Sequence, residues 1–209
     1  MRTHGKLAVL LILPFLFLLS ACTGNMPSMH GGMSSNSNDN MQNIGQATAM
    51  PMDHSNMQMD ASKPFDAQFI DSMIEHHQGA VTMAQAVLQQ AEHAELKTMA
   101  EAIIAAQNAE IQQMQGWRTA WHPDLPPTGG MGMSMGDMMI SSDESIPFDQ
   151  RFLTAMISHH QGAIEMAQMA QQMAERQEIK DLAAAIITAQ QAEIKQMQEW
   201  LQAWFGVTQ

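Results

Sequence analysis

The sequence is short of cysteine and of basic residues, and each shortage excludes a class of protein. Cys22 is the only cysteine, so no intramolecular disulfide can form, and the fold has no thiolate for a blue-copper or copper-oxidase site. Lys and Arg number 9 against 21 Asp and Glu, which gives a net charge of −12 at pH 7. A phosphate-binding protein would present a basic face, so no nucleic acid is expected as a partner.

Two motifs of metalloproteins are also missing. No Glu-x-x-His sequence occurs in the chain, which disfavours a ferritin-type di-iron oxidase. The adjacent His76 and His77 do not have the short spacing of Cys and His ligands in structural zinc sites. Nothing specific indicates a hydrolytic triad either. We therefore expect a protein that is not an enzyme.

What the sequence has in excess is methionine, with 23 residues in a chain of 209. Average composition predicts only a few in a chain of this length, so this is the strongest deviation in the sequence. The thioether sulfur is soft and polarisable, which suits methionine both to irregular cores and to Cu(I)-type metals.

The first residues have the pattern of a secretion signal. A basic start precedes an apolar run from Leu7 to Leu19, which is too short for a comfortable membrane span. The run ends in Leu19-Ser20-Ala21-Cys22, which resembles the lipidation box of bacterial lipoproteins. We predict a signal peptide over 1–21 and a mature protein that begins at a lipidated Cys22. That protein would be periplasmic or otherwise extracytoplasmic and would touch the membrane only through its lipid anchor. An ordinary signal peptide with an incidental cysteine is the alternative.

Two polar segments without a hydrophobic period carry many of the methionines. We predict a disordered tether over 22–63 and a linker over 123–147, because such segments bury too little apolar surface to offset the entropy of ordering. A methionine in a coil has no core to fill, so we interpret these residues as secondary sites of metal capture. Compositional drift and a sink for oxidants, through reversible Met sulfoxide formation, are the alternatives. The candidates are Met50, Met52, His54, Met57 and Met59 in the tether, and Met131, Met133, Met135, Met138 and Met139 in the linker.

The rest of the chain is a unit that occurs twice. Phe65–Trp121 and Phe148–Trp204 align without a gap at a constant offset of 83 residues, and about 33 of the 57 paired positions are identical. Each copy contains Met-x-x-His-His-Gln-Gly-Ala near its start. A repeat this regular indicates a fold built by duplication, and we place the two units at 64–122 and 148–206.

Each repeat has the apolar spacing of two helices. In the first repeat, positions facing one side recur every three or four residues from Phe69 to Ala91 and again from Leu96 to Trp121. Asp66 and Asp149, each preceded by a proline and a phenylalanine, are predicted to be helix N-caps. Each apolar stripe is too narrow for its helix to be stable alone. We therefore predict an all-α fold, in which two repeated helical hairpins form one antiparallel four-helix bundle.

The position of the hairpin turn determines which residues face each other. If the first hairpin turns at about 93–94, facing residues on the core side have numbers that sum to roughly 187. The predicted pairs are His77–Glu110, Met73–Met114 and Ala80–Gln107 in the first repeat, and His160–Glu193, Met156–Met197 and Ala163–Gln190 in the second. Buried polar groups there need partners, and a His, a Glu and two Met at one level form a plausible metal cage. His76 and Met83 lie toward one edge of the same face.

Structural roles compete with this interpretation. A buried His–Glu pair is commonly a satisfied hydrogen bond, and a buried Met is commonly core. The whole set is nevertheless identical in both copies, while neighbouring positions differ. Glu75 of the first repeat, for example, corresponds to Ser158 in the second. This retention favours binding. The four tryptophans, repeated as Trp117/Trp200 and Trp121/Trp204, are predicted to seal the ends of the bundle. A soft cation stacked on an indole face is the alternative for them.

The repeated pattern resembles a known family. M-x-x-H-H-x-x-A-x-x-M-A, then E-[LI]-K, then I-I-x-x-Q-x-x-E-I-x-x-M-x-x-W is similar to the secreted bacterial CopM-like proteins, which share domain of unknown function 305. The resemblance covers most of Phe65–Trp204 and leaves out the tether. It implies a ferritin-like four-helix bundle and, as in at least some members, binding of Cu(I) and Ag(I) in support of copper tolerance. The ligands it implies are Met73, His76, His77, Met83 and Met114, with Met156, His159, His160, Met166 and Met197 in the second repeat.

The residues and the resemblance together predict an extracytoplasmic binder of Cu(I), and of Ag(I) as a mimic. It would buffer or deliver the ion for copper resistance, with a copper efflux or carrier protein as a partner. Glu110 and Glu193 join the implied ligands because the register places them opposite the histidines. Two alternatives stay open: a structural lipoprotein whose Met-rich segments scavenge oxidants, and a binder of Cu(II) or Zn(II) through the His and Glu of the bundle.

Overall fold

The computed structural model describes residues 59–128 and 139–209, which belong to a compact unit spanning Met50–Gln209. The predicted signal peptide, the lipidation box with Cys22 and the tether up to residue 58 lie outside the described residues. The same holds for the linker candidates Met131, Met133, Met135 and Met138. The structure therefore bears on the two repeats and on the segments that immediately flank them.

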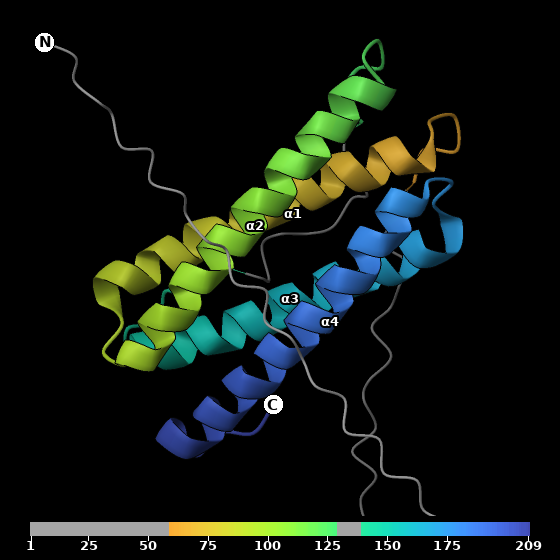
Figure 1. Cartoon of the computed structure of the whole chain (residues 1–209). Coiled ribbons are helices and arrows are strands. Elements are labelled where there is room, and N and C mark those ends of the chain that lie inside the picture. The colour runs from red at the N-terminus through yellow and green to blue at the C-terminus, as the bar shows by residue number, and fades with distance from the viewer. Residues whose placement is uncertain (1–58, 129–138) are drawn as a thin grey trace, which may run out of the picture. The chain divides into compact units, whose positions relative to one another are not determined.

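The described part of the chain contains four long helices (Figure 1), α1 (Phe65–Gln90), α2 (Ala94–Trp121), α3 (Phe148–Met173) and α4 (Gln177–Trp200). A π-helical turn, η3 (Leu201–Phe205), extends α4 and ends at Gly206, whose φ of 69° favours glycine. No strand occurs within 59–128 or 139–209, which confirms the all-α prediction. In the same residues, no helix is long and apolar enough to cross a membrane.

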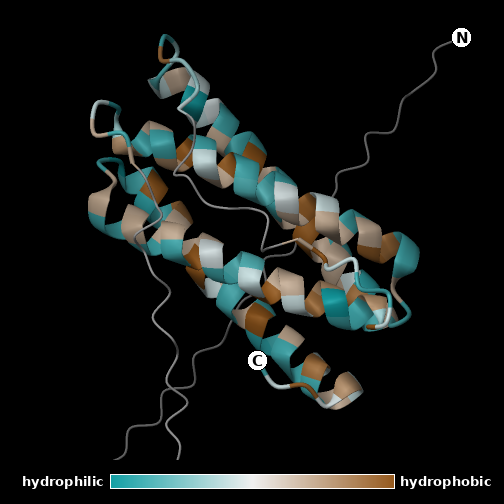
Figure 2. Cartoon of the chain, turned by 180° about the vertical axis from the view of Figure 1, so that it is seen from behind, coloured by the Kyte–Doolittle hydropathy of each residue, from teal (hydrophilic) through white to brown (hydrophobic). Residues whose placement is uncertain are grey.

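Each repeat folds into one hairpin, and the hairpins pack through their first helices. α2 packs along α1 and α4 along α3, while α1 packs against α3 (Figure 1). Hydrophobic and hydrophilic positions are interspersed along every helix (Figure 2), as expected when one face of each helix is buried. The prediction of a four-helix bundle made of two repeated hairpins is confirmed.

The predicted N-cap role of Asp66 and Asp149 is wrong. The residues at the cap positions are Pro64 for α1 and Pro147 for α3, and neither helix start has a side-chain cap bond. Proline suits this end of a helix because it lacks the N–H that would be left unbonded there. Both aspartates are nevertheless buried, so each carboxylate must have partners elsewhere.

Each aspartate instead bonds to the turn of the other hairpin. The Asp66 carboxylate accepts the backbone N–H of Glu175 at 3.0 Å and of Arg176 at 3.1 Å. The Asp149 carboxylate accepts the N–H of Glu92 at 3.2 Å and of His93 at 3.0 Å, and it lies 2.7 Å from Nδ1 of His93. The start of α1 therefore lies beside the end of α3, and the reverse holds at the other end, so α1 and α3 run antiparallel.

An indole from the other hairpin also covers each turn. The Trp204 ring stacks on His93 with centroids 3.7 Å apart, and the Arg176 guanidinium lies 4.1 Å from the centre of the Trp121 ring. His93 and Arg176 occupy equivalent positions of the repeat. We call the aspartate and tryptophan contacts with the opposite turn the reciprocal clamp. The reciprocal clamp agrees with the predicted sealing role of the tryptophans.

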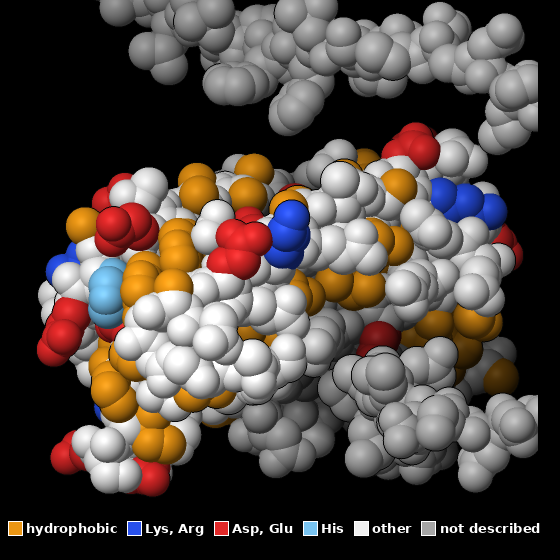
Figure 3. Space-filling model, turned by 90° about the horizontal axis from the view of Figure 1, so that it is seen from below, with side chains coloured by type: hydrophobic (Ala, Val, Ile, Leu, Met, Phe, Trp, Pro, Cys, Tyr) orange, Lys and Arg blue, Asp and Glu red, His pale blue; other side chains and the backbone are white. Residues whose placement is uncertain are grey.

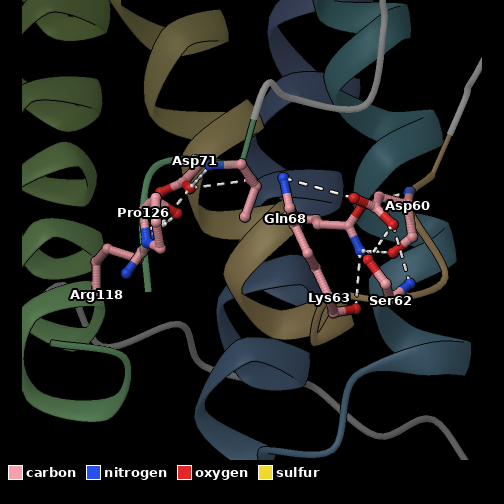
Figure 4. A network of polar contacts seen from close by, with 8 residues as sticks. Asp60, Ser62, Lys63, Gln68, Asp71, Arg118 and Pro126 are labelled. Carbon is pink, nitrogen blue, oxygen red and sulfur yellow. Dashed lines mark hydrogen bonds and ion pairs between the residues drawn. The ribbon is translucent and has the colours of Figure 1, made fainter. Parts of the chain in front are cut away.

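The segments that flank the first hairpin are fastened to α1. The side-chain amide of Gln68 accepts the N–H of Asp60 at 2.8 Å and donates to the carbonyl of Asp60 at 2.9 Å (Figure 4). Nε of Arg118 donates to Asp71 at 2.8 Å, and the N–H and hydroxyl of Thr128 donate to the same carboxylate. These bonds hold the residues before α1 and after α2 against the bundle.

Candidate metal centre

The centre of each hairpin holds a buried histidine against a glutamate. Nε2 of His77 lies 2.6 Å from Oε2 of Glu110, and Nε2 of His160 lies 2.6 Å from Oε2 of Glu193. The histidines have no exposed surface, while the glutamate side chains are 23% and 25% exposed. The predicted register of the two hairpins is therefore confirmed at this level. The other ring nitrogen of each histidine, Nδ1, is buried without a hydrogen-bond partner.

The second pair of histidines lies where the two hairpins meet. The rings of His76 on α1 and His159 on α3 have centroids 3.7 Å apart and planes inclined by 46°. Both side chains are buried, and none of their four ring nitrogens has a partner at hydrogen-bond geometry, although the backbone of His76 lies close to the His159 ring. His76 and His159 are equivalent positions of the repeat, so the contact lies on the pseudo-twofold axis of the bundle. The spacing within one repeat places each residue toward the edge of the buried face, and the contact between the two rings depends on how the hairpins pack.

Burial lowers the pKa of both of these rings. Loss of solvent is the main cause of a His76 pKa well below the usual 6.5, and the neighbouring His159, His77 and His160 add to it by charge repulsion. The same loss of solvent lowers the pKa of His159 to about 3, with repulsion from His160 and His77 as the next causes. At neutral pH both rings therefore carry a nitrogen lone pair, which is the form that binds a metal.

The repeated methionines lie in two hydrophobic clusters, and each cluster takes residues from both hairpins. Every one of these methionines is at least 98% buried. One cluster contains Met73, Met114 and Met166, and the other contains Met156, Met197 and Met83. Met83 and Met166 thus pack with methionines of the opposite repeat. Of the candidates in the flanking segments, Met59 packs against the first cluster and Met139 is 53% exposed.

Two glutamines belong to the same buried layer, although they are absent from the predicted site. Gln107 on α2 and Gln190 on α4 are buried, and the Oε1 atom of each has no hydrogen-bond partner. They precede Glu110 and Glu193 by three residues, which places them on the same helix face. The sequence contains a sign of their importance. Both repeats have glutamine at this position, where the helix buries a polar side chain.

The donors in this layer are mostly soft or neutral. Within 59–128 and 139–209, no three His, Cys, Asp or Glu side chains lie close enough together to hold a metal ion. A site in this layer would therefore draw on the thioethers as well as the imidazoles. Histidine accounts for little of the surface in Figure 3, in keeping with the burial of the repeated double histidines.

These features define a class of duplicated four-helix bundles with a buried double histidine in each half. The chain belongs to the family described as Domain of unknown function (DUF305), which matches residues 18–118 and 119–209. The predicted CopM-like family is therefore confirmed. A separate comparison with curated proteins found no match to the chain.

Solved structures of this family are similar over most of the two repeats. CopM in its Ag-bound form is 40% identical with a TM-score of 0.58, covering 68% of this chain and 98% of CopM. CopM in its Cu(II)-bound form is 42% identical with a TM-score of 0.60, covering 67% and 97%. A DUF305 protein from Streptomyces coelicolor, assigned to the secreted proteins, is 28% identical with a TM-score of 0.60, covering 71% and 98%. CopM has also been solved in a Cu(I)-bound form.

Proposed function

We propose that the protein binds Cu(I), and Ag(I) through the same softness, outside the cytoplasm. It buffers the ion or delivers it to an efflux or carrier protein, in support of copper resistance. The observation that carries this proposal is the buried layer described above, in which histidine nitrogens without partners lie one helical turn from buried methionines. The Ag-bound and Cu(I)-bound forms of CopM, at 40% identity, support the same ions.

The chemistry of the donors favours a monovalent ion. Thioether sulfur is a soft ligand that selects Cu(I), and imidazole nitrogen suits copper in general. Zn(II) and Cu(II) would find few carboxylate or imidazole ligands gathered at one point in the described residues. The Cu(II)-bound form of CopM nevertheless makes Cu(II) the second candidate ion.

The segments outside the described residues complete the proposal. The signal peptide over 1–21 and a lipidated Cys22 would place the bundle at a membrane surface, and the secreted relative from Streptomyces coelicolor supports an extracytoplasmic location. The tether methionines would capture ions weakly and raise their local concentration near the bundle. No enzymatic role forms part of this proposal.

A titration with Cu(I) tests the proposal. The mature chain is titrated without oxygen against a chromophoric Cu(I) chelator, and a bundle variant is compared with it. The variant replaces each Met by Leu and each His by Gln at Met73, His77, Met114, Met156, His160 and Met197. We expect the variant to lose the tightest binding step and to keep the weaker capacity.

The matched control is Met99→Leu with Met169→Leu, two partly buried methionines that pack against the clusters but are not methionine in both repeats. It should bind as the unaltered chain does. If the bundle variant stays helical and keeps the tightest step, the bundle is a scaffold and the Met-rich segments are the binder.

A further inference from the structure

The two glutamates of the buried layer contact the histidines in a way that determines which nitrogen can bind an ion. Each carboxylate lies 2.6 Å from Nε2 of its histidine, in both repeats. Each Nδ1 is buried and has no partner. One ring nitrogen is therefore engaged and the other is free, and this arrangement occurs twice.

A carboxylate has only acceptor oxygens, so the ring nitrogen that faces it must carry the hydrogen. A neutral imidazole has one N–H, and with that N–H at Nε2 the lone pair is at Nδ1. Carboxylates commonly hold metal-binding histidines in this manner, through the nitrogen that does not touch the metal. For His77 and His160 the geometry thus makes Nδ1 the binding atom.

The carboxylate also supplies charge. The candidate ligands of this layer are neutral, because thioethers and neutral imidazoles carry no charge, and Met73 and Met114 lie in an apolar cluster. A monovalent ion bound there adds one positive charge to a medium in which an unpaired charge is costly. Glu110, with 23% of its side chain exposed, keeps contact with water and can neutralise that charge across the ring.

We propose that Glu110 and Glu193 are positioning residues that do not touch the ion. Each fixes the tautomer of His77 or His160 that presents Nδ1, and each neutralises one positive charge bound at that atom. This inference rests on the proposed function. It assigns the glutamates a different role from the ligand role that the register alone suggests.

The first measurement uses the unaltered chain labelled with ¹⁵N in its histidines. Before metal is added, His77 and His160 should show the Nε2–H tautomer. Addition of Ag(I) should shift the Nδ1 resonance of both residues while Nε2 stays protonated. A shift that shows binding at Nε2 overturns the proposal, and this measurement does not depend on any variant folding.

The second measurement uses Glu110→Gln with Glu193→Gln in the full chain. The amide keeps the size of the side chain but can donate as well as accept, so the two tautomers of His77 and His160 should become mixed in the metal-free protein. The affinity of the tightest Ag(I) step should fall by about tenfold to a hundredfold, as is typical when such a partner is removed. The matched control is Glu101→Gln with Glu178→Gln, exposed positions on the same two helices that remove the same charge.

The outcomes separate the two proposals. If the unaltered chain binds no Ag(I) at the bundle, the proposed function fails. If it binds and the glutamate variant has the same affinity as the control, the positioning role is wrong. If affinity falls but the tautomers of the metal-free variant are unchanged, the glutamates act through their charge alone, and the assignment of the tautomer to them is overturned.

Discussion

Mild acid should destabilise the metal-free bundle through His76 and His159. Both rings have a pKa well below 6.5 in the folded protein, about 3 for His159, because burial disfavours their charged form. In the unfolded chain both regain a pKa near 6.5. Above that value neither state is protonated and the rings contribute no pH dependence. Below it the unfolded chain binds protons that the folded protein does not, so stability is lost as pH falls from 6.5 toward the folded pKa.

The size of the effect follows from the number of rings. Each contributes a slope of about 1.4 kcal/mol per pH unit below 6.5, so between pH 7.5 and 5.5 the two together should cost about 3 kcal/mol. This figure requires only that both rings stay unprotonated in the folded protein down to pH 5.5. It is a large fraction of the stability of a typical domain.

Urea unfolding at pH 7.5, 6.5 and 5.5 measures this loss, and His76→Asn with His159→Asn is the comparison. The variant removes the two titrating rings, so its free energy of unfolding should change less over the same range. All other ionisable groups are shared, and their contribution cancels in the difference. If both proteins lose the same free energy between pH 7.5 and 5.5, the two rings are not the neutral buried groups that the structure describes.

Two further predictions concern the clamp and the tether. Asp149→Ala should lower the free energy of unfolding by about 1–3 kcal/mol, since it leaves two partly buried N–H groups without a charged acceptor. Asp124→Ala, at an exposed position, should change it by less than about 0.5 kcal/mol. Similar losses in both variants would refute the role of the clamp. Deleting residues 23–58, which keeps Met59 and the residues bonded to Gln68, should lower the number of Cu(I) ions bound but leave the tightest step nearly intact. The reason is that the bundle ligands are already ordered, whereas a flexible segment loses about 1–2 kcal/mol for each residue it fixes. Loss of the tightest step on this deletion would assign the strongest site to the tether.

The hairpins could be predicted from the sequence because they obey a local rule. Two helices of uniform rise joined by a short turn bring together residues whose numbers have a constant sum, so His77 and Glu110 could be paired without a structure. The duplication gives the same pairing a second time, in His160 and Glu193. The same rule predicts nothing about how one hairpin lies on the other.

What the sequence did not reveal lies between the hairpins. The partners of Asp66 are 109 and 110 residues away, while its flanking Pro64 and Phe65 make it look like an ordinary helix cap. The contact of His76 with His159 depends on where α1 crosses α3, which no spacing within one repeat specifies. In both cases a buried polar group is present in both copies, but its partner depends on tertiary packing.

The reciprocal clamp has a consequence for assembly. Neither hairpin supplies the acceptor for its own turn, so each half is completed only by its counterpart, as in a protein split into two fragments. The counterpart need not come from the same chain, because the second hairpin of a neighbouring molecule presents the same aspartate and the same indole. At high concentration two chains can therefore exchange hairpins and form a closed dimer with every native contact retained. Joining the two hairpins in one chain keeps the matching half nearby, which favours closure within a single molecule.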